Sequence, residues 1–309
     1  MEKFTDWRDK GTGIAPFLPP SSYRERILWD SQFVTNFLHL LVFIPRAVLT
    51  LPLLLILRIL KLRDATNWVL MKLVLANRVK LDLNVFKLKK SEVRRRKKEL
   101  LLQPGDIYFI NYSSAFVAVL LEFISAGPIR FLVPENGEIY ELSWRQFVLY
   151  TLDGSVNVKS YITSLSEGQV RTYAELVKKY GKESFVWIMV PEGTCSNGKS
   201  VLPLQLSRRQ LEAFFGGTTD SIMLKNISIQ LNSSLTTPLK ISPIKYLGYV
   251  LLKTTAITAK VRFNDPVSLQ DDNEDLDTLR MRLNDNDKFK LVSKKLDLAS
   301  KREFMKRYY

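Results

Sequence analysis

Hydrophobic and polar residues alternate from about residue 105 onward in a way that predicts an α/β domain. Short apolar runs that are typical of strands are separated by longer segments whose apolar residues recur at helical spacing. The predicted strands are 107–110, 129–133, 185–190, 227–231 and 257–263. The run 185–190 (FVWIMV) is apolar throughout, which indicates a central strand buried on both faces. We therefore expect a mixed, largely parallel sheet flanked by helices.

Helix start signals lie between these runs. Ser143 and Gln146 have the spacing of a capping box, and Ser166 and Gln169 repeat it ahead of a helix that Gly181 closes. Further helices are expected at 115–125, after Ser113 and Ser114, at 208–215, and within a basic C-terminal region, 287–308.

The N-terminal part of the chain contains an apolar stretch, 37–57, that is long enough to cross a bilayer. Pro45 and Arg46 stand near its middle, and an arginine there costs roughly 2.5–3.5 kcal/mol on insertion scales. A helical hairpin that enters one leaflet fits better, because Pro45 can form the bend and Arg46 can reach back to the interface. The alternative is a pair of buried core helices with Arg46 at their turn.

A basic cluster follows at 87–98, where Glu92 is the one acidic residue. Next to an apolar stretch, such a cluster favours an anionic membrane surface and places the following domain on the cytosolic side. A solvated helix face or a nuclear-import-like patch is the alternative. We expect four parts: a polar segment (1–36), the membrane-associated hairpin (37–62), a basic linker (63–103) and the α/β domain (104–309).

Overall charge also predicts an anionic partner. There are 46 Lys and Arg residues against 31 Asp and Glu, a formal net charge of +15. Lipid headgroups, acyl-CoA phosphates and nucleic acid are all compatible with this charge. Nucleic acid is disfavoured, because the basic residues are not interleaved with aromatics in an RNA-binding module and the 37–57 stretch has no place in one.

Two residue counts restrict the chemistry. The single cysteine, Cys195, excludes an internal disulfide framework and a Cys-rich zinc site. The single histidine, His39, lies in the apolar stretch. Histidine is the usual general base near neutral pH and the commonest metal ligand. Unless His39 reaches the active site, the sequence excludes Ser-His-Asp catalysis, Cys-His catalysis and His-based metal sites. We therefore expect no metal.

A buried strand that ends in Pro191-Glu192-Gly193-Thr194, preceded in the chain by an Asn- and Ser-rich turn at 111–114, resembles the glycerolipid acyltransferase family. Three stretches, 7–19, 193–203 and 287–297, resemble the fungal lysophosphatidic acid acyltransferases of lipid droplets and endoplasmic reticulum. The resemblance covers nearly the whole chain. It implies transfer of a fatty acyl group from acyl-CoA to a lysophospholipid hydroxyl.

The resemblance implies a substrate loop at 191–203. A Gly-rich turn after a buried strand offers backbone N–H groups that suit a phosphate monoester. The candidate substrate-binding residues are Glu192, Gly193, Thr194, Ser196, Lys199 and Ser200. Glu192 would orient hydrogen-bond donors or the glycerol hydroxyl, as the family implies. Cys195 stands where the family has an Arg, and Lys199 is the candidate substitute, without the bidentate grip of Arg.

The family motif Asn-His-x-Ser-x-x-Asp aligns with residues 111–117. Asn111 and Ser114 are kept, whereas Tyr112 takes the place of the His and Val117 that of the Asp. In the family, the His removes a proton from the attacking hydroxyl and the Asp holds its ring. A phenol with a pKa of about 10 is a weak base at neutral pH. Losing a positioned base costs about 10²- to 10⁴-fold in rate, so the catalytic residues stay unassigned.

Three routes would restore transfer. A thioester is already activated, so proximity and electrostatic stabilisation at the loop would support slow transfer. Cys195 would alternatively accept the acyl group, or His39 would fold back from the apolar stretch. A second family motif, Gly-x-x-Phe-Ile-Asp-Arg, is best matched by 154–159, with Lys159 in place of the Arg.

The expected activity is therefore that of a 1-acylglycerol-3-phosphate O-acyltransferase, which converts lysophosphatidic acid to phosphatidic acid in triacylglycerol and lipid-droplet metabolism. No cofactor is expected, with acyl-CoA as co-substrate. The expected partners are acyl-CoA, the lysophospholipid and an anionic membrane or droplet surface, on the cytosolic face of endoplasmic reticulum and lipid droplets. The alternative is an inactive lipid-binding protein that organises such surfaces.

Overall fold

The fold is described by a computed structural model. It covers residues 2–19, 48, 52–53, 56, 69, 79–85, 88–95, 100–162, 168–182, 184–216, 223–252, 257–268, 276–284 and 290–309.

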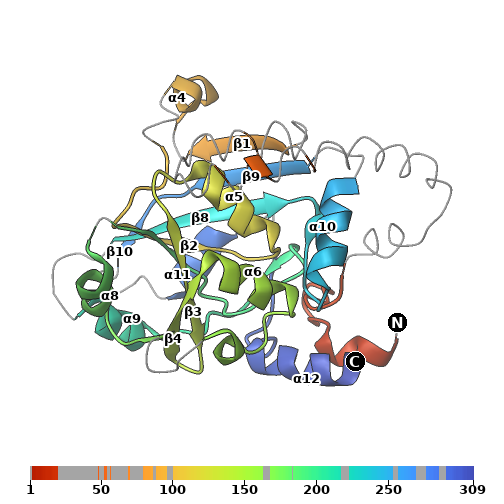
Figure 1. The fold of residues 1–309 in the computed structure, drawn as a ribbon. Helices are drawn as coiled ribbons and strands as arrows, with labels where there is room; N and C mark the ends of the chain where they lie inside the picture. Colours follow the sequence, from red (N-terminus) through yellow and green to blue (C-terminus); the bar gives the residue numbers. More distant parts are fainter. Residues whose placement is uncertain are drawn as a thin grey trace.

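A nine-stranded mixed sheet forms the centre of this described part (Figure 1). Its strands are β1 (Val79–Val85), β2 (Ile107–Ile110), β3 (Ile129–Glu135), β4 (Glu138–Ser143), β5 (Gln169–Val170), β6 (Val186–Met189), β8 (Met223–Leu231), β9 (Ile257–Phe263) and β10 (Val267–Ser268). The order is β1-β9-β8-β2-β6-β3-β4-β5, with β10 beside β8. The central strands β8, β2, β6 and β3 are parallel to one another, while β9 and β4 run antiparallel to their inner neighbours. The predicted α/β class with a mixed, mostly parallel sheet is confirmed.

Helices cover both faces of the sheet. On one face lie α5 (Phe116–Ile124), α6 (Trp144–Leu152) and α10 (Pro243–Leu252), and on the other α8 (Tyr173–Tyr180), α9 (Arg208–Phe215) and α11 (Leu276–Leu283). Alternate residues of β2 point to opposite faces: Tyr108 and Ile110 join the core under α5, and Phe109 joins the core under α9. All four residues of β6 are buried, as the run 185–190 predicted.

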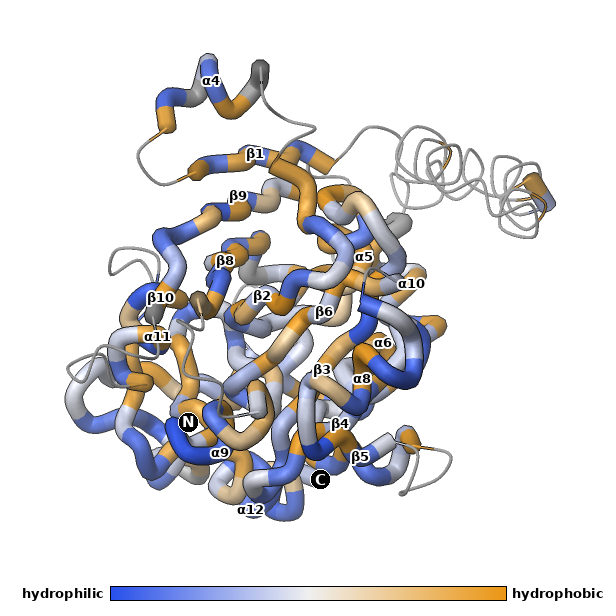
Figure 2. Tube along the Cα trace, turned by 90° about the vertical axis from the view of Figure 1, so that its left-hand side faces the viewer, coloured by the Kyte–Doolittle hydropathy of each residue, from blue (hydrophilic) through white to orange (hydrophobic). Residues whose placement is uncertain are grey.

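The remaining described elements are smaller. They are η1 (Glu2–Trp7), α4 (Lys90–Arg95), η3 (Val158–Tyr161), η4 (Ser233–Leu235), the pair β7 (Ser200–Val201) and β11 (Lys290–Leu291), and α12 (Leu298–Tyr308). Figure 2 shows that α4, which holds part of the basic cluster, stands apart beyond β1. Strand β1 lies inside the predicted linker 63–103 and was not predicted. It pairs in parallel with β9 at the edge of the sheet.

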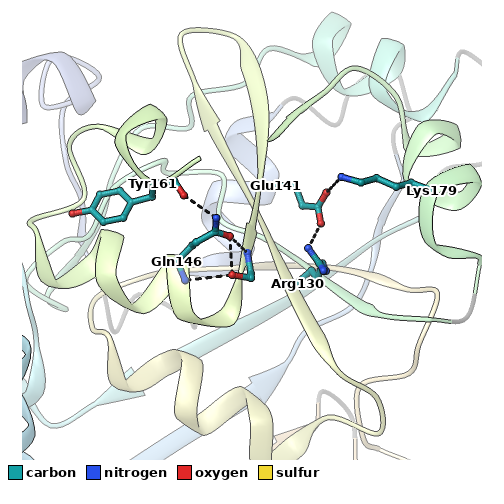
Figure 3. A network of polar contacts seen from close by, with 6 residues as sticks. Arg130, Glu141, Gln146, Tyr161 and Lys179 are labelled. Atoms are coloured by element: carbon teal, nitrogen blue, oxygen red, sulfur yellow. Dashed lines mark hydrogen bonds and ion pairs between the residues drawn. The ribbon is translucent and has the colours of Figure 1, made fainter. Parts of the chain in front are cut away.

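The capping box predicted at Ser143 is confirmed. Ser143 accepts a hydrogen bond from the Gln146 backbone N–H, and its own N–H donates to Gln146 Oε1 at 2.8 Å. Gln146 also donates to the Tyr161 carbonyl, which joins α6 to η3 (Figure 3). In the same view, Glu141 of β4 lies between Arg130 of β3 and Lys179 of α8 and links the strand pair to that helix.

Two predicted helices differ from the structure. The predicted cap Ser166 lies outside the described residues; the helix expected after it begins at Tyr173, where Thr172 caps it by accepting from the Glu175 N–H, and residues 169–170 form β5. Of the predicted region 287–308, the structure describes residues 290–308; among these, α12 begins after its cap Asp297, and residues 290–291 pair with β7. The helix at 208–215 and the strand at 257–263 have the predicted bounds.

The predicted membrane hairpin lies largely outside the described residues, as does His39. Within the part that is described, no helix has the length and apolar character needed to cross a bilayer. Of the stretch 37–57, Val48, Pro52, Leu53 and Ile56 are described; all are exposed, Val48 by 64%, and all are helical. The hairpin itself stays a prediction.

Candidate active site

Glu192 follows the buried strand β6 and is itself fully buried. Its carboxylate accepts two backbone hydrogen bonds, from the Tyr112 N–H at 3.1 Å and from the Leu202 N–H at 2.7 Å. Burial raises the pKa of Glu192 to about 8, against the opposing effect of these two donors. Glu192 thus joins both ends of its own loop to the turn after β2.

The position of Gly193 has no room for a side chain. Its φ is +62°, and a Cβ there would lie 2.6 Å from the Pro134 carbonyl oxygen on β3. The Gly193 carbonyl accepts from the hydroxyl of Tyr150, which reaches it from α6. The loop is therefore held against β3 and α6 at its first turn.

The turn 111–114 lies beside the Glu192 loop because β2 and β6 are adjacent parallel strands, whose carboxyl ends meet at one edge of the sheet. Besides the bond from Tyr112 N–H to Glu192, the Ser196 N–H donates to the Tyr112 carbonyl at 3.1 Å. Farther along, the Thr237 N–H donates to the Ser113 carbonyl at 3.0 Å. The two segments that carry the family resemblance thus meet as the topology requires.

Tyr112, which the predicted alignment sets against the family His, has its side chain in the core. Its hydroxyl contacts the hydroxyls of Thr151 and of Ser155, the latter at 3.1 Å, and its ring packs 5.1 Å from that of Phe147. Burial raises the pKa of Tyr112 well above its ordinary value. Val117, which the same alignment sets against the family Asp, is fully buried on α5. Neither side chain supplies a base at neutral pH.

Asn111 and Ser114, which were predicted to be retained from the family motif, bind backbone groups of neighbouring segments. The Asn111 amide donates to the Ile229 carbonyl at 3.0 Å and accepts from the Ile229 N–H at 2.6 Å, so it continues the β2–β8 pairing by one step. Ser114 donates to the Leu235 carbonyl at 2.6 Å and accepts from the Phe116 N–H at the start of α5.

The hydroxyls predicted to bind substrate face inward. Thr194 donates to the Ser155 carbonyl at 2.7 Å, and Ser196 donates to the Ser200 carbonyl at 3.0 Å. Among the six predicted substrate-binding residues, Lys199 is the exposed one. Ser200 is buried, and its hydroxyl has no hydrogen-bond partner in the part of the chain that the structure describes.

Cys195 is buried at the centre of this loop. Its Sγ lies 3.5 Å from the Ser196 carbonyl and 3.8 Å from the Thr237 hydroxyl. Burial raises the pKa of the thiol to about 11, so Cys195 is protonated at neutral pH.

The segment 154–159, proposed for the second motif, reaches the site through Ser155. Its carbonyl accepts from Thr194, and its hydroxyl contacts Tyr112. Lys159, in contrast, lies at the surface, 3.5 Å from Glu138 of β4. The structure therefore brings the segment to the loop but leaves Lys159 outside.

Sequence reasoning missed two buried cations. Lys301 of α12 is fully buried and donates to the Cys195 carbonyl at 2.6 Å, and burial lowers its pKa to about 8. Arg280 of α11 donates to the carbonyls of Val201 at 2.8 Å and Leu202 at 3.0 Å. A signal existed for Lys301, because it shares the buried face of α12 with Leu298 and Phe304, at a spacing of three residues.

The N-terminal segment covers the loop from outside. The Asn197 N–H donates to the Pro16 carbonyl at 2.9 Å, and its amide donates to the Ala15 carbonyl at 3.0 Å. Asp9 accepts from the Ser293 N–H at 3.0 Å, and Lys290 N–H donates to the Lys199 carbonyl. The stretches 7–19 and 193–203 and the described part of 287–297, separated in sequence, are therefore packed together.

Metal ligands are not grouped in the described ranges: no cluster of three or more His, Cys, Asp or Glu side chains there is arranged to hold a metal ion. The acidic group at the site is Glu192, whose two oxygens are engaged by backbone N–H donors.

Comparison with known proteins identifies the family. No family model matches the chain. Over its full length it is 34% identical to lysophosphatidic acid:oleoyl-CoA acyltransferase 1 of Saccharomyces cerevisiae, covering 97% of that protein. It is 27% identical over 219 residues to a protein of Schizosaccharomyces pombe named for the same activity, covering 65% of this chain and 66% of that one.

Among solved structures, a match is the 1-acyl-sn-glycerophosphate acyltransferase PlsC of Thermotoga maritima. It is 14% identical, with 89% of this chain and 96% of that chain covered, and a TM-score of 0.37, which is too low to carry an argument. The full-length identity to the Saccharomyces cerevisiae protein, in contrast, identifies the family. The chain belongs to the glycerolipid acyltransferase family, in the group of the fungal lysophosphatidic acid:oleoyl-CoA acyltransferases.

Proposed function

We propose that the protein transfers a fatty acyl group from acyl-CoA to the free hydroxyl of lysophosphatidic acid, forming phosphatidic acid. The observation that carries this function is the full-length identity to a protein named for that reaction. The geometry supports it, because the Glu192 loop is fixed against the turn 111–114, as the family resemblance implies. No cofactor is needed, since acyl-CoA brings the activated carbonyl.

In this reaction, the lysophosphatidic acid hydroxyl oxygen attacks the thioester carbonyl carbon. A new C–O bond forms, the C–S bond breaks, and the coenzyme A thiolate takes up the proton that the hydroxyl loses. We assign Lys199, the exposed residue of the loop, to the substrate phosphate as a point charge. Glu192 holds the loop in place through the N–H groups of Tyr112 and Leu202.

Of the three routes to transfer without a His-Asp pair, we favour proximity and electrostatic stabilisation at the preorganised loop. The covalent route gains no support, because burial keeps the Cys195 thiol protonated. Tyr112 is held by Thr151 and Ser155 and, with its raised pKa, is no base near neutral pH. His39 lies outside the described residues.

A transfer assay tests the activity. The full chain is purified from cells that lack other acyltransferases and incubated with labelled oleoyl-CoA and lysophosphatidic acid. Labelled phosphatidic acid is expected, and Glu192→Gln is expected to lower the rate by about 10-fold or more, because it loosens the loop. Glu303→Gln, at an exposed site on α12, is the matched control and leaves the rate unchanged. Equal rates for the chain and Glu192→Gln would assign the activity to a contaminant.

Two further variants separate the routes. Cys195→Ala is expected to keep the rate, whereas loss of turnover with retained fold would favour the covalent route. Tyr112→Phe is expected to lower the rate less than 10-fold, because the Tyr112 hydroxyl does not act as the base. Removal of a positioned base would instead lower the rate by about 10²- to 10⁴-fold. A larger loss would give the Tyr112 hydroxyl a part in the chemistry.

One observation favours a second candidate function, lipid binding without turnover. The base of the family motif is replaced by Tyr112, whose buried hydroxyl contacts those of Thr151 and Ser155. Under this alternative, the purified chain binds vesicles that contain lysophosphatidic acid and forms no labelled product. Product formation above the Glu192→Gln background rules it out.

We further propose that the protein works on the cytosolic face of endoplasmic reticulum and lipid droplets, anchored by a helical hairpin at 37–62 and a basic linker at 63–103 ahead of the domain 104–309. The exposed apolar side chains of Val48, Leu53 and Ile56 support an apolar environment for this stretch. Deletion of 37–57 is expected to move the protein from the membrane to the soluble fraction. Continued pelleting of the deleted protein in high salt would contradict the anchor.

A further inference from the structure

The inner face of helix α10 packs next to the candidate active site. Tyr246 and Val250 are buried in a cluster with Phe116 of α5 and Ile257 of β9. The Tyr246 hydroxyl lies 3.0 Å from the Ser114 hydroxyl, the Ser of the family motif. The helix is therefore fixed in position directly behind the turn 111–114.

The outer face of α10 is apolar and open. Ile244 is 83% exposed and Leu247 57% exposed, one helical turn apart. A Cβ placed at Gly248, the next position on this face, would meet no atom within 4 Å. Figure 1 shows α10 on the other side of the molecule from α8 and α9. An apolar strip of this kind on a helix whose other face is packed in the core indicates contact with something outside the domain.

The charge of the surrounding chain selects the kind of partner. From residue 221 to residue 264 there is no Asp or Glu. The cations of this region are Lys225, Lys240, Lys245, Lys253, Lys260 and Arg262. Lys245 is exposed beside Ile244, and Lys240 is exposed just before the helix, 2.5 Å from Asp153. Apolar side chains next to Lys245, in a stretch of chain that itself carries no Asp or Glu, suit a surface that is apolar within and anionic outside.

We propose that the face of α10 formed by Ile244, Lys245 and Leu247 docks on an anionic phospholipid surface. The side chains of Ile244 and Leu247 enter the acyl-chain boundary, and Lys245 meets the phosphates. Because Tyr246 joins the same helix to Ser114, this contact sets the membrane surface next to the turn 111–114. Delivery of a lipid substrate from this surface to the turn rests on the proposed acyltransferase function, whereas the docking itself does not.

A site-specific label tests the contact in the full chain. Leu247→Cys is labelled with an environment-sensitive fluorophore, and the native Cys195 does not compete because it is buried. Met281→Cys on α11 is the matched control, 53% exposed on the opposite face of the sheet. Each labelled protein is mixed with vesicles of phosphatidylcholine alone or with added phosphatidic acid.

We expect the label at position 247 to shift to the blue and brighten with the anionic vesicles, and the label at position 281 to stay unchanged. Ile244→Ser combined with Leu247→Ser is expected to weaken partition into these vesicles by about ten-fold, in proportion to the lost apolar area. If the vesicles sediment with the protein while the label at 247 stays unchanged, another surface makes the contact and the proposal is overturned.

Two other outcomes are also decisive. A signal at position 247 that rises with protein concentration in the absence of vesicles would assign this face to a second copy of the chain. The readout needs no turnover, so an inactive protein with a positive signal overturns the acyltransferase function alone. An active protein with no signal overturns the docking alone.

Discussion

The Glu192 loop and helix α10 depart from the usual distribution of side chains in opposite directions. The loop region buries two ionisable groups, Glu192 and Lys301, and satisfies them with the backbone of Tyr112, Leu202 and Cys195. Helix α10 exposes Ile244 and Leu247 while its polar Tyr246 hydroxyl points inward. The contrast indicates that the loop's charges serve the protein's own backbone, whereas the apolar face of α10 serves an external contact.

The largest effect is expected from Glu192→Ala. This change leaves the N–H groups of Tyr112 and Leu202 buried without an acceptor. Each orphaned donor costs about 1–3 kcal/mol, so the free energy of unfolding falls by roughly 2–6 kcal/mol. Urea titration followed by tryptophan fluorescence measures it. Glu303→Ala, at an exposed site, is the control and stays within about 0.5 kcal/mol. Equal effects would mean that the carboxylate of Glu192 does not hold the loop.

A smaller loss is expected from Gly193→Ala. Its φ of +62° costs an L-residue about 1–2 kcal/mol, and the new Cβ would press on the Pro134 carbonyl oxygen, which adds further loss. Gly216→Ala, with a φ of +87° and open space at the Cβ, isolates the backbone part. The same titration gives both values. Equal losses for the two variants would contradict the close approach of the loop to β3.

The structure explains how much of this arrangement a sequence can predict. Strands β2, β6 and β9, and the capping box of α6, follow from local pattern, because apolar runs and Ser-x-x-Gln spacing act within a few residues. The meeting of the turn 111–114 with the loop follows from the topology of parallel strands. Strand β1 was missed, because its alternation lies within a basic region.

The contacts that close the site were beyond local pattern. Asn197 binds the carbonyls of Ala15 and Pro16, far earlier in the chain, and Lys301 reaches Cys195 from the last helix. Such contacts depend on which segments the fold brings together, and a single sequence does not encode that in its periodicity. The inward orientation of Thr194 and Ser196 was missed for the same reason, since a hydroxyl in a Gly-rich loop suits a ligand as well as a carbonyl.

A pH dependence of stability is expected from the loop. Burial raises the pKa of Glu192 from 4.5 to about 8, so the folded chain keeps a proton that the unfolded chain releases between these values. The contribution of this carboxyl to the free energy of unfolding is full below about pH 4.5 and is lost as pH rises through about 8. The free energy of unfolding then falls by at most about 1.4 kcal/mol per pH unit. Urea titrations at several pH values measure it.

Glu192→Gln is the control for this window, because it removes the titrating group and keeps an acceptor oxygen. The difference in unfolding free energy between the chain and this variant is expected to change with pH below about 8. Above that value Lys301 acts in the opposite direction: its pKa is lowered from 10.5 to about 8, so stability recovers as pH rises toward 10.5. A difference independent of pH would show that Glu192 is ionised throughout.

The smallest effect on stability is expected at α10, where Ile244→Ser combined with Leu247→Ser removes side chains that already face solvent. Exposed positions of this kind change the free energy of unfolding by about 0.5 kcal/mol or less. On the inner face, Tyr246→Phe removes the hydroxyl that contacts Ser114 and is expected to cost about 0.5–1.5 kcal/mol. A large loss from the outer pair would mean that Ile244 and Leu247 support the fold rather than an external contact. If only Tyr246→Phe lowers the free energy of unfolding, and only the Ile244→Ser, Leu247→Ser double variant binds vesicles more weakly, the inner face of α10 supports the fold and the outer face makes the external contact.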